Sequence, residues 1–283
     1  FIITDNNASN CLLEAAKQLK IKLFYLNNYS PKNRLSIKSL STTSKCLLDQ
    51  NKADDICLIL HTSGTTSRPK QVQLSCMNII SSALNIARVL QLEKKDKGMN
   101  IMPLFHIHGL IASLLSSIVT GSSVVCTSGF NALTFYGNIK TFKPTWITAV
   151  PTMYQAILSR ASRNKEIIQA SNLRLLRSSS AAMPVATIEA LENAFQCPVI
   201  EAYGMTEASH QMASNFLDST RKPGSVGKSA GPEIALLRDN KLITVANTVG
   251  EIIIRGSNVT KGYKNNNKAN KENFFDGLTI NVS

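Results

Sequence analysis

Short apolar segments alternate with helical segments along most of this chain, and this rhythm restricts the fold more than any other feature. Ile56–His61 is a strongly apolar run, and Ser75–Leu90 carries apolar residues at helical spacing. Further strands and helices are expected in alternation at Met99–Met102, Gly109–Thr120, Ser123–Cys126, Trp146–Val150, Leu173–Arg177, Pro184–Phe195 and Val199–Ala202. Such alternation predicts an α/β fold with a largely parallel sheet, in which ligands bind beyond the carboxyl ends of the strands.

The two ends of the chain differ from this middle part. Near the N-terminus we expect a strand, a helix, a strand and a polar loop, at Phe1–Thr4, Ala8–Leu19, Lys22–Leu26 and Asn27 to about Asp55. After about Gly224, short strands are expected at Ile234–Leu237, Leu242–Val245 and Glu251–Arg255, and Lys264–Ser283 shows no pattern. We therefore predict an α/β core over residues 1–223, incomplete at its N-terminus, and the truncated start of a β-rich subdomain over residues 224–283.

Composition places the chain among soluble globular proteins. It has 283 residues, of which 43% are hydrophobic, and no apolar run approaches the roughly 20 residues of a membrane helix. No signal peptide is visible, and because the first residue is Phe1 rather than Met, we expect the chain to begin inside a larger protein. The six widely spaced cysteines include no CxxC pair, which favours a reducing compartment over a disulfide framework or zinc site.

The formal net charge of +13 has two interpretations. One is a surface rich in Lys and Asn, and the other is attraction of a polyanion such as ATP or CoA. The basic residues are scattered, without a long Lys/Arg block and interleaved aromatic residues, so we expect no nucleic-acid partner.

A phosphate-binding loop is predicted directly after the strand Ile56–His61, which we expect to be buried. The loop contains hydroxyl side chains, one glycine and one lysine, at Thr62, Ser63, Gly64, Thr65, Thr66 and Lys70. Glycine lets the backbone approach an anion closely, the hydroxyl and backbone N–H groups donate hydrogen bonds, and lysine adds a positive charge. The string is not a Walker A loop, because Lys70 stands between Pro69 and Gln71.

Three further strings accompany the loop. Met102–Gly109 contains two histidines, His106 and His108, two residues apart. A turn rich in Ser and Ala follows Arg177 and includes Ser178, Ser180, Ala181 and Ala182. The third string combines an aromatic residue with acidic and hydroxyl residues, Glu201, Ala202, Tyr203, Thr206 and Glu207. An aromatic face suits a nucleobase and a carboxylate suits Mg²⁺ that bridges phosphates, so these strings favour a nucleotide site.

Together the strings resemble the AMP-forming adenylating superfamily, which includes acyl-CoA synthetases, over nearly the whole chain. The resemblance implies stacked, mostly parallel sheets flanked by helices, as in the large N-terminal domain of these enzymes, with a small β-rich subdomain. It implies that Thr66 and Lys70 hold the β- and γ-phosphates of ATP, Tyr203 stacks near adenine, Thr206 contacts the α-phosphate and Glu207 holds Mg²⁺. The turn at Ser180, Ala181 and Ala182, together with Glu201 and Ala202, would bind the nucleotide, and His106 would border the acyl pocket. Arg68 stands where the family usually has a small residue.

The implied activity is that of an acid–thiol ligase. A carboxylic acid reacts with ATP to give an acyl-adenylate, and CoA then displaces AMP, with Lys70, Thr206, Glu207 and His106 as catalytic residues. The string Thr206–Met212 looks most like the oxalate–CoA ligase branch. A second substrate carboxylate needs donors or cations, which His108, His210 and a serine of Ser178–Ser180 would supply. The predicted substrate residues are therefore His106, His108, Ser178 and His210.

The resemblance also defines what this chain lacks. Relatives continue past Gly262–Tyr263 into a Thr-Gly-Asp string and a lysine-bearing lid, neither of which is recognisable before Ser283. We therefore expect a fragment with little or no activity by itself. Two alternatives stay open, a catalytically inactive nucleotide-binding remnant and an adenylating enzyme with a different acceptor. An intracellular location, cytoplasmic or peroxisomal, is expected, without integral membrane association, and the oligomeric state is open.

Overall fold

The computed structural model describes residues 2–4, 9–21, 23–25, 52–62, 69–239, 241–275 and 278–281, and the chain divides into two units, Phe1–Gln50 and Asn51–Ser283. In the first unit, the parallel strands β1 (Ile2–Thr4) and β2 (Leu23–Tyr25) are connected through helix α1 (Asn10–Gln18). The Ser9 hydroxyl caps this helix by accepting a hydrogen bond from the Leu12 N–H. The predicted strand–helix–strand order is confirmed. The loop predicted from Asn27 lies mostly outside the described residues.

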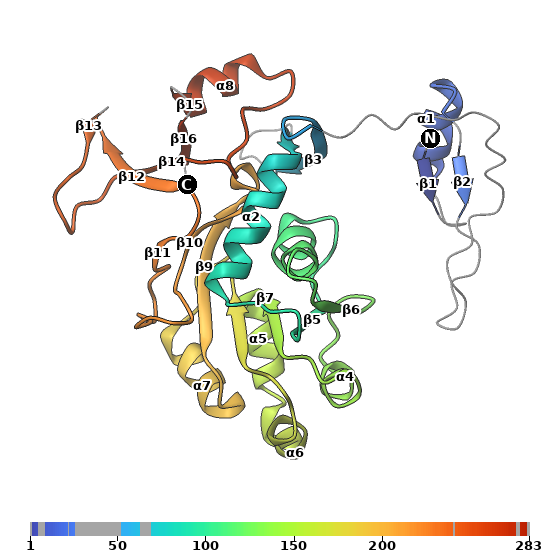
Figure 1. Cartoon of the computed structure of the whole chain (residues 1–283), viewed down its shortest axis with the longest axis vertical. Helices are drawn as coiled ribbons and strands as arrows, with labels where there is room; N and C mark the ends of the chain where they lie inside the picture. Colours follow the sequence, from blue (N-terminus) through green and yellow to red (C-terminus); the bar gives the residue numbers. More distant parts are fainter. Residues whose placement is uncertain are drawn as a thin grey trace. The chain divides into compact units, whose positions relative to one another are not determined.

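A seven-stranded sheet dominates the second unit (Figure 1). Its order is β11-β10-β9-β8-β7-β5-β6, and the members are β5 (Lys97–Asn100), β6 (Ser123–Cys126), β7 (Trp146–Ala149), β8 (Leu175–Ser178), β9 (Val199–Met205), β10 (His210–Ser214) and β11 (Lys228–Ser229). Strands β5 to β9 are parallel, and β10 and β11 add antiparallel strands at one edge. The predicted α/β class with a largely parallel sheet is confirmed.

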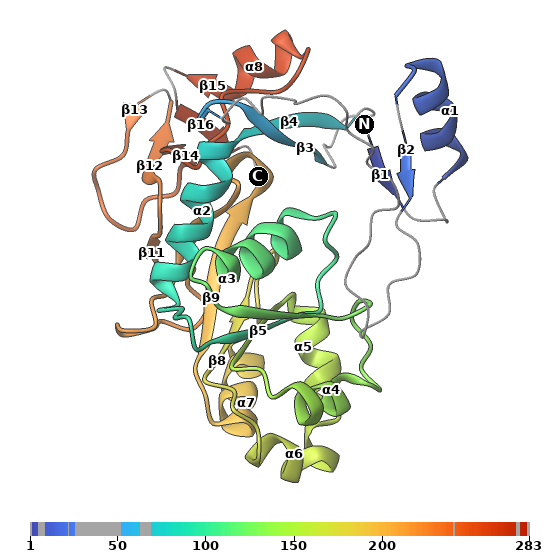
Figure 2. The ribbon, with the colours of Figure 1, turned by 45° about the vertical axis from the view of Figure 1, so that its right-hand side comes forward.

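Helices cover both faces of this sheet (Figure 2). One face packs against α4 (Phe135–Phe142), α5 (Pro151–Leu158), α6 (Lys165–Gln169) and α7 (Val185–Phe195), and the other against α2 (Cys76–Val89), a π-helical segment η1 (His108–Leu115) and α3 (Ser116–Ile118). Single turns of 3-10 helix lie at Ala161–Asn164 (η2) and Thr206–Ala208 (η3). Successive strand residues alternate between the faces: Trp146 packs toward α2, whereas Ile147 packs toward α5 and α7.

The predicted buried strand at Ile56–His61 is corrected by the structure. Strand β3 (Ile56–Thr62) pairs antiparallel with β4 (Lys70–Ser75) in a two-stranded sheet, and Ile56 and Ile59 are 50% and 41% exposed. The buried apolar face of the hairpin comes from β4, through Val72 and Leu74. The sequence prediction missed β4, although its residues alternate between polar and apolar, as expected for a strand with one face in solvent.

The C-terminal part forms a second sheet, entirely antiparallel, in the order β13-β12-β14-β16-β15. Its strands are β12 (Glu233–Arg238), β13 (Lys241–Leu242), β14 (Glu251–Arg255), β15 (Phe274–Phe275) and β16 (Leu278–Asn281). The β-rich character predicted here is confirmed, although β13 ends at Leu242. The expectation of no regular structure after Lys264 is wrong, because β15, β16 and α8 (Asn267–Asn273) lie there, with Asn266 capping the helix. The domain boundary near Gly224 stays a prediction.

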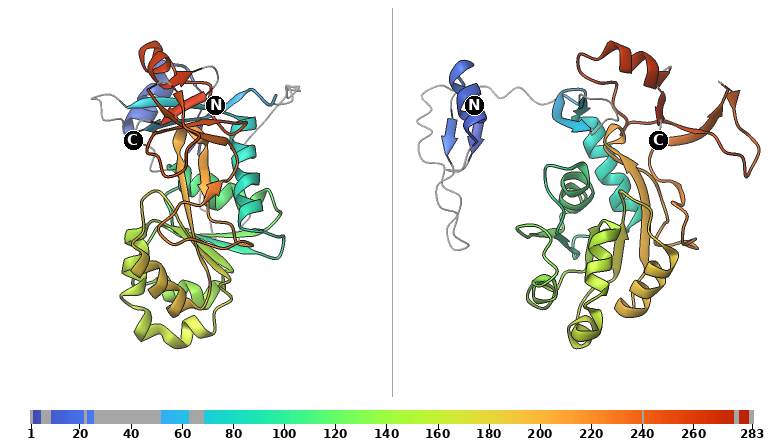
Figure 3. Two further views of the ribbon diagram at one scale, coloured as in Figure 1. Left: turned by 90° about the vertical axis from the view of Figure 1, so that its left-hand side faces the viewer. Right: turned by 180° about the vertical axis from the view of Figure 1, so that it is seen from behind.

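The hairpin β3–β4 and the α8 region lie side by side at one end of this unit (Figure 3). An antiparallel β-bridge between Val72 and Tyr263 connects them, and the Lys264 N–H donates to the Gln71 carbonyl beside it. The N-terminus of α2 belongs to the same assembly. Its cap, Ser75, forms a reciprocal capping box with Asn78. The Asn78 amide also donates to the carbonyls of Ser257 and Val259, which holds the loop before Tyr263 in place.

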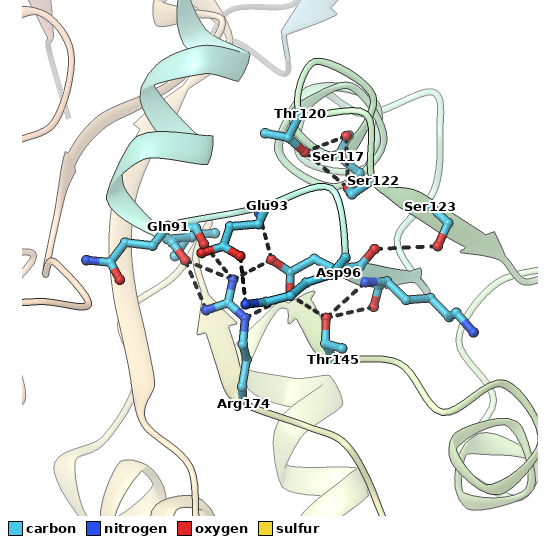
Figure 4. A network of polar contacts seen from close by, with 12 residues as sticks. Gln91, Glu93, Asp96, Ser117, Thr120, Ser122, Ser123, Thr145 and Arg174 are labelled. Atoms are coloured by element: carbon cyan, nitrogen blue, oxygen red, sulfur yellow. Dashed lines mark hydrogen bonds and ion pairs between the residues drawn. The ribbon is translucent and has the colours of Figure 1, made fainter.

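An ion pair between the buried Asp96 and the partly exposed Arg174 lies at the amino ends of the central strands (Figure 4). The Arg174 guanidinium donates to both carboxylate oxygens of Asp96 at 2.8 Å and to the carbonyls of Leu90 and Gln91. Asp96 also accepts from the Thr145 hydroxyl and the Glu93 N–H. The network therefore ties the end of α2 to the starts of β5, β7 and β8.

None of the described helices is both long and apolar enough to cross a membrane.

Candidate functional site

A tight turn between β9 and β10 carries the most specific of the predicted site residues. Strand β9 ends at Met205, the 3-10 turn Thr206–Ala208 follows, and the chain reverses at Ser209 and His210, both with positive φ (+50° and +102°). Gly204 permits this reversal, because a Cβ there would overlap the carbonyl of His210. The turn presents Glu207 and His210, each more than 90% buried, to two different clusters of side chains.

The first cluster contains both buried histidines. His108, the first residue of η1, lies with Nε2 2.6 Å from the Thr148 hydroxyl and Nδ1 3.0 Å from the Ser180 hydroxyl. The His210 ring lies against it, with ring centroids 4.9 Å apart. The structure thus brings together His108, His210 and Ser180, which lie far apart in the sequence.

The other predicted substrate residues lie outside this cluster. His106 is exposed, beside the largely exposed Phe105. Ser178 is buried, and its hydroxyl has no hydrogen-bond partner among the described residues. Gly109 directly follows the buried His108. A Cβ there would overlap the Pro103 carbonyl, so glycine permits the tight entry into η1.

Arg177, for which the sequence motifs predict no role, lies at the base of the histidine cluster. None of its surface is exposed, and its guanidinium donates to the Thr148 hydroxyl at 3.2 Å and the Gln211 amide oxygen at 3.1 Å. Burial, together with the nearby Arg177 charge, holds the pKa of His108 and His210 well below the usual range. Burial also lowers the pKa of Arg177 to about 10. At neutral pH the cluster therefore contains two neutral imidazoles and one positive charge.

The second cluster joins the loop lysine to the predicted metal ligand through Tyr263. The Tyr263 hydroxyl donates to Glu207 Oε1 at 2.7 Å, and Lys70 Nζ lies 5.0 Å from the centre of the Tyr263 ring. Burial and the neighbouring Glu207 raise the pKa of Tyr263, so its hydroxyl stays a hydrogen-bond donor. Thr62 and Lys70 form the last pair of the β3–β4 ladder. Between them Ser63, Gly64, Thr65 and Thr66 lie outside the described residues.

The remaining predicted nucleotide residues line the turn after β8 and the strand beside it. Ser180, Ala181 and Ala182 are exposed, and Ser180 has φ +72°. Tyr203 and Thr206 are half-buried, whereas Ala202 and Glu201 are buried. The Glu201 carboxylate accepts a hydrogen bond from the Gly224 N–H at 3.0 Å, so it holds the following loop to β9. Burial raises the pKa of Glu201.

The contacts of the Glu207 carboxylate suit a magnesium ligand. Tyr263 occupies Oε1, and no described residue is hydrogen-bonded to Oε2, which is left for a cation. Mg²⁺ is commonly held by one or two carboxylates together with substrate phosphates, and Lys70 stands beside the same tyrosine as a cationic partner for phosphate. The fit therefore rests on a carboxylate at the Tyr263 hydroxyl and a lysine over the ring of the same tyrosine.

Comparison with known proteins decides the family. The model of the AMP-binding enzyme family matches residues 1–264. The chain belongs to this family. It is 49% identical over 231 residues to the oxalate–CoA ligase of Arabidopsis thaliana, covering 80% of this chain and 45% of that protein. It is 47% identical over 224 residues to the oxalate–CoA ligase of Saccharomyces cerevisiae, covering 79% of this chain and 40% of that protein.

The solved structures agree with this membership of the AMP-binding enzyme family. O-succinylbenzoate CoA synthetase from Bacillus subtilis, in complex with AMP, superposes with a TM-score of 0.73 at 32% identity, covering 81% of this chain and 47% of that one. The fold is therefore that of the large N-terminal domain of adenylating enzymes. The chain spans about half the length of the curated relatives it matches.

Proposed function

We propose that this chain supplies the nucleotide- and acid-binding part of an AMP-forming acid–CoA ligase whose acid is oxalate or a similarly small dicarboxylate. The carboxylate oxygen attacks the α-phosphorus of ATP and pyrophosphate leaves, after which the CoA thiol attacks the acyl carbon and AMP leaves. Two relatives named as oxalate–CoA ligases, at 49% and 47% identity, support this assignment. An intracellular location, cytoplasmic or peroxisomal, belongs to the same proposal.

The polar histidine cluster is the observation that carries the choice of acid. A fatty or aromatic acid needs an apolar tunnel, whereas His108, His210 and Arg177 place hydrogen-bonding groups and one positive charge together. Such surroundings suit a short, doubly charged acid beside Ser180 better than a hydrocarbon chain. We assign His108, His210 and Ser180 to the acid, and we leave His106 and Ser178 as predicted substrate residues without such contacts.

On the nucleotide side, Lys70 and the loop before it would bind the β- and γ-phosphates, and Thr206 the α-phosphate. Glu207 would hold Mg²⁺, which, when bound, offsets the negative charge of the phosphates. The exposed residues Ala181 and Ala182 and the half-buried Tyr203 would bind the adenine, whereas Ser180, which the resemblance places at the nucleotide, is assigned here to the acid. These residues orient the reactants and provide electrostatic stabilisation rather than covalent chemistry.

A fusion tests this proposal, because the chain matches about half of each relative. Residues 1–264 are joined to the part of the Arabidopsis protein that follows its matched segment, and the fusion is assayed with ATP, CoA and a panel of acids. We expect turnover of oxalate to exceed that of malonate, acetate, octanoate and cinnamate. Turnover of octanoate or cinnamate with oxalate inactive would contradict the choice of acid.

The same fusion separates the two alternatives. A nucleotide-binding remnant would bind ATP but catalyse no exchange of pyrophosphate into ATP. An adenylating enzyme with a different acceptor would catalyse oxalate-dependent exchange but form no CoA thioester. We expect both exchange and thioester formation.

Tyr263→Phe should weaken the affinity for Mg²⁺ and ATP together by about 10-fold, the lower end of the range for partners that orient a metal ligand. The change removes the hydrogen bond to Glu207 but keeps the aromatic ring beside Lys70 and the packing against Phe274. The measurement is calorimetric titration of the chain with a non-hydrolysable ATP analogue at several Mg²⁺ concentrations. Tyr136→Phe removes a buried tyrosine hydroxyl that bonds the Ile157 carbonyl instead, and it should leave this affinity unchanged.

A further inference from the structure

Two arginines, three residues apart around β8, have opposite electrostatic surroundings. Arg174 forms a bidentate pair with Asp96 and lies partly in solvent. Arg177 is entirely buried, and no carboxylate of the described residues lies within salt-bridge distance of it. A buried charge without an opposite charge is costly in a folded protein. Arg174 is thus explained by structure, whereas Arg177 calls for a functional explanation.

The position of Arg177 follows from strand alternation. Thr148 and Arg177 are register partners on β7 and β8, two residues beyond Trp146 and Leu175, which face α2. Both polar side chains therefore point to the face that bears η1 and its first residue, His108. The Gln211 amide is fixed from the other side, since its nitrogen donates to the Ala230 carbonyl and its oxygen accepts from Arg177. The guanidinium Nε–H has no partner among the described residues.

The contacts of Thr148 determine where the protons lie. Its hydroxyl oxygen accepts from Arg177, a group that can only donate, at 3.2 Å. The one hydroxyl proton then has a single acceptor among the described residues, His108 Nε2 at 2.6 Å. With Nε2 accepting, neutral His108 carries its proton on Nδ1 and donates to the Ser180 hydroxyl oxygen at 3.0 Å. The opposite tautomer would leave the buried Thr148 proton without an acceptor, which is unfavourable.

Because the Ser180 hydroxyl accepts from His108, its own proton is available for a hydrogen bond to a ligand. Ser180 is exposed in the turn beyond the carboxyl end of β8, where ligands bind in parallel sheets. Each bond in a chain of hydrogen bonds polarises the next one. The series from Arg177 through Thr148 and His108 to Ser180 therefore extends the influence of a buried positive charge to an exposed donor.

We propose that Arg177 is a specificity-determining positioning residue, which acts through Thr148 and His108 to make Ser180 a donor for the second carboxylate of a small dianionic acid. The inference rests on the proposed function for the class of substrate. It assigns the preference for a dianion to a buried arginine that need not contact the acid. Acetate, with one carboxylate used in the reaction, gains nothing from the arrangement.

The test uses the 283-residue chain with a non-hydrolysable ATP analogue and Mg²⁺, and measures affinities for oxalate, malonate and acetate by calorimetry. Arg177→Met and Thr148→Val, which keep side-chain size approximately, should each weaken oxalate binding by on the order of 10- to 100-fold and leave acetate binding unchanged. Thr127→Val is the matched control, because its hydroxyl bonds the carbonyls of Asn100 and Gly129 at a different place. This control should bind oxalate as the unmodified chain does.

Three further measurements distinguish this positioning role from a purely structural role. Arg177→Met should leave the melting temperature unchanged or raise it, because an unpaired buried charge is removed. Nitrogen-15 NMR of the histidine rings should show His108 protonated at Nδ1, and Thr148→Val should change this signal. Oxalate affinity should stay constant from pH 6 to 9, since the titratable groups around Arg177 are His108, His210 and, behind its backbone, Tyr154. A charge carried by the histidines would instead give an affinity that declines above about pH 6.5.

Equal oxalate affinity in Arg177→Met and the unmodified chain would overturn the inference, and so would a His108 ring protonated at Nε2. Failure of the proposed function has a different signature. In that case none of the three acids binds, although His108 carries its proton on Nδ1 and loses this tautomer in Thr148→Val. That result would confirm the direction of the hydrogen bonds and contradict the class of substrate.

Discussion

Glu207→Gln is expected to lower the affinity of the chain for Mg²⁺ together with an ATP analogue by on the order of 100-fold, the size of effect that removal of one preorganised electrostatic group commonly has. The replacement is nearly isosteric, and its amide oxygen still accepts the hydrogen bond from Tyr263. The substitution therefore removes the charge and keeps the position. Calorimetric titration with the analogue, with and without EDTA, measures the effect.

Removal of the metal gives an internal check on this prediction. With EDTA, the affinity of the unmodified chain should fall toward that of Glu207→Gln, because both would then lack the cation that Glu207 would hold. Glu233→Gln alters an exposed carboxylate that pairs with Arg255, and it should change nothing. A chain with Glu207→Gln that retained the full Mg²⁺-dependent affinity would exclude this carboxylate as the metal ligand.

Asp96→Asn is expected to lower the free energy of unfolding by about 3 kcal/mol, the lower end of the cost of breaking a buried ion pair. The carboxylate is 1% exposed and accepts from Arg174, Thr145 and the Glu93 N–H, so an amide in its place would leave donors unpaired. We expect the lower end because the Arg174 side chain is 30% exposed and regains some hydration. Urea unfolding followed by circular dichroism measures the change.

The matched control lies in the same loop. Glu93→Gln removes the charge of a side chain that is 60% exposed and pairs with Lys95, and its cost should lie within about 0.5 kcal/mol. The backbone N–H of Glu93, which bonds Asp96, is unaffected. Equal costs for the two variants would show that the network contributes no more than a surface pair.

The Asp96 effect should depend on pH in a defined direction. Burial by itself would raise the pKa of Asp96, but the hydrogen bonds from Arg174, Glu93 and Thr145 outweigh it, so the pKa is lowered. A lowered pKa in the folded state means that the contribution to stability is complete above the unfolded value of about 3.9 and is lost as pH falls further. The stability difference between the unmodified chain and Asp96→Asn should therefore be constant from pH 5 to 8 and shrink below about pH 4.

Local sequence signals were sufficient for most of the α/β core. Short apolar runs located β6, β7, β8 and the first part of β9, and proline at the start of α5 indicated where that helix begins. The motif strings also indicated Lys70, Glu207, His108 and His210 as site residues. These predictions are possible because helix and strand periods, turn-forming residues and motif strings each involve only a few neighbouring positions.

Three features required the tertiary structure because they depend on residues far apart in the chain. Tyr263 lies 56 positions from Glu207, and the β-bridge to Val72 brings it between Glu207 and Lys70. The apolar run Ile56–Thr62 is half-exposed, because it has one antiparallel neighbour instead of two parallel ones. In both cases the environment of a residue is set by its partner strand, about which the local pattern carries no information.

Arg177 is the third such feature and shows the same division within the site itself. From the sequence alone, the side chain of an arginine at the end of a strand is expected to lie in solvent, since charged side chains are rarely buried. The strand length and register place it beside Thr148, beneath η1 and against β10, where nothing exposes it to water. The amino-acid sequence by itself indicated the family, many of the strands and helices of the α/β core and the residues expected to meet the nucleotide. The three-dimensional packing decided which of them are buried, which hydrogen bonds orient them and where the uncompensated charge lies, because these depend on contacts between distant segments.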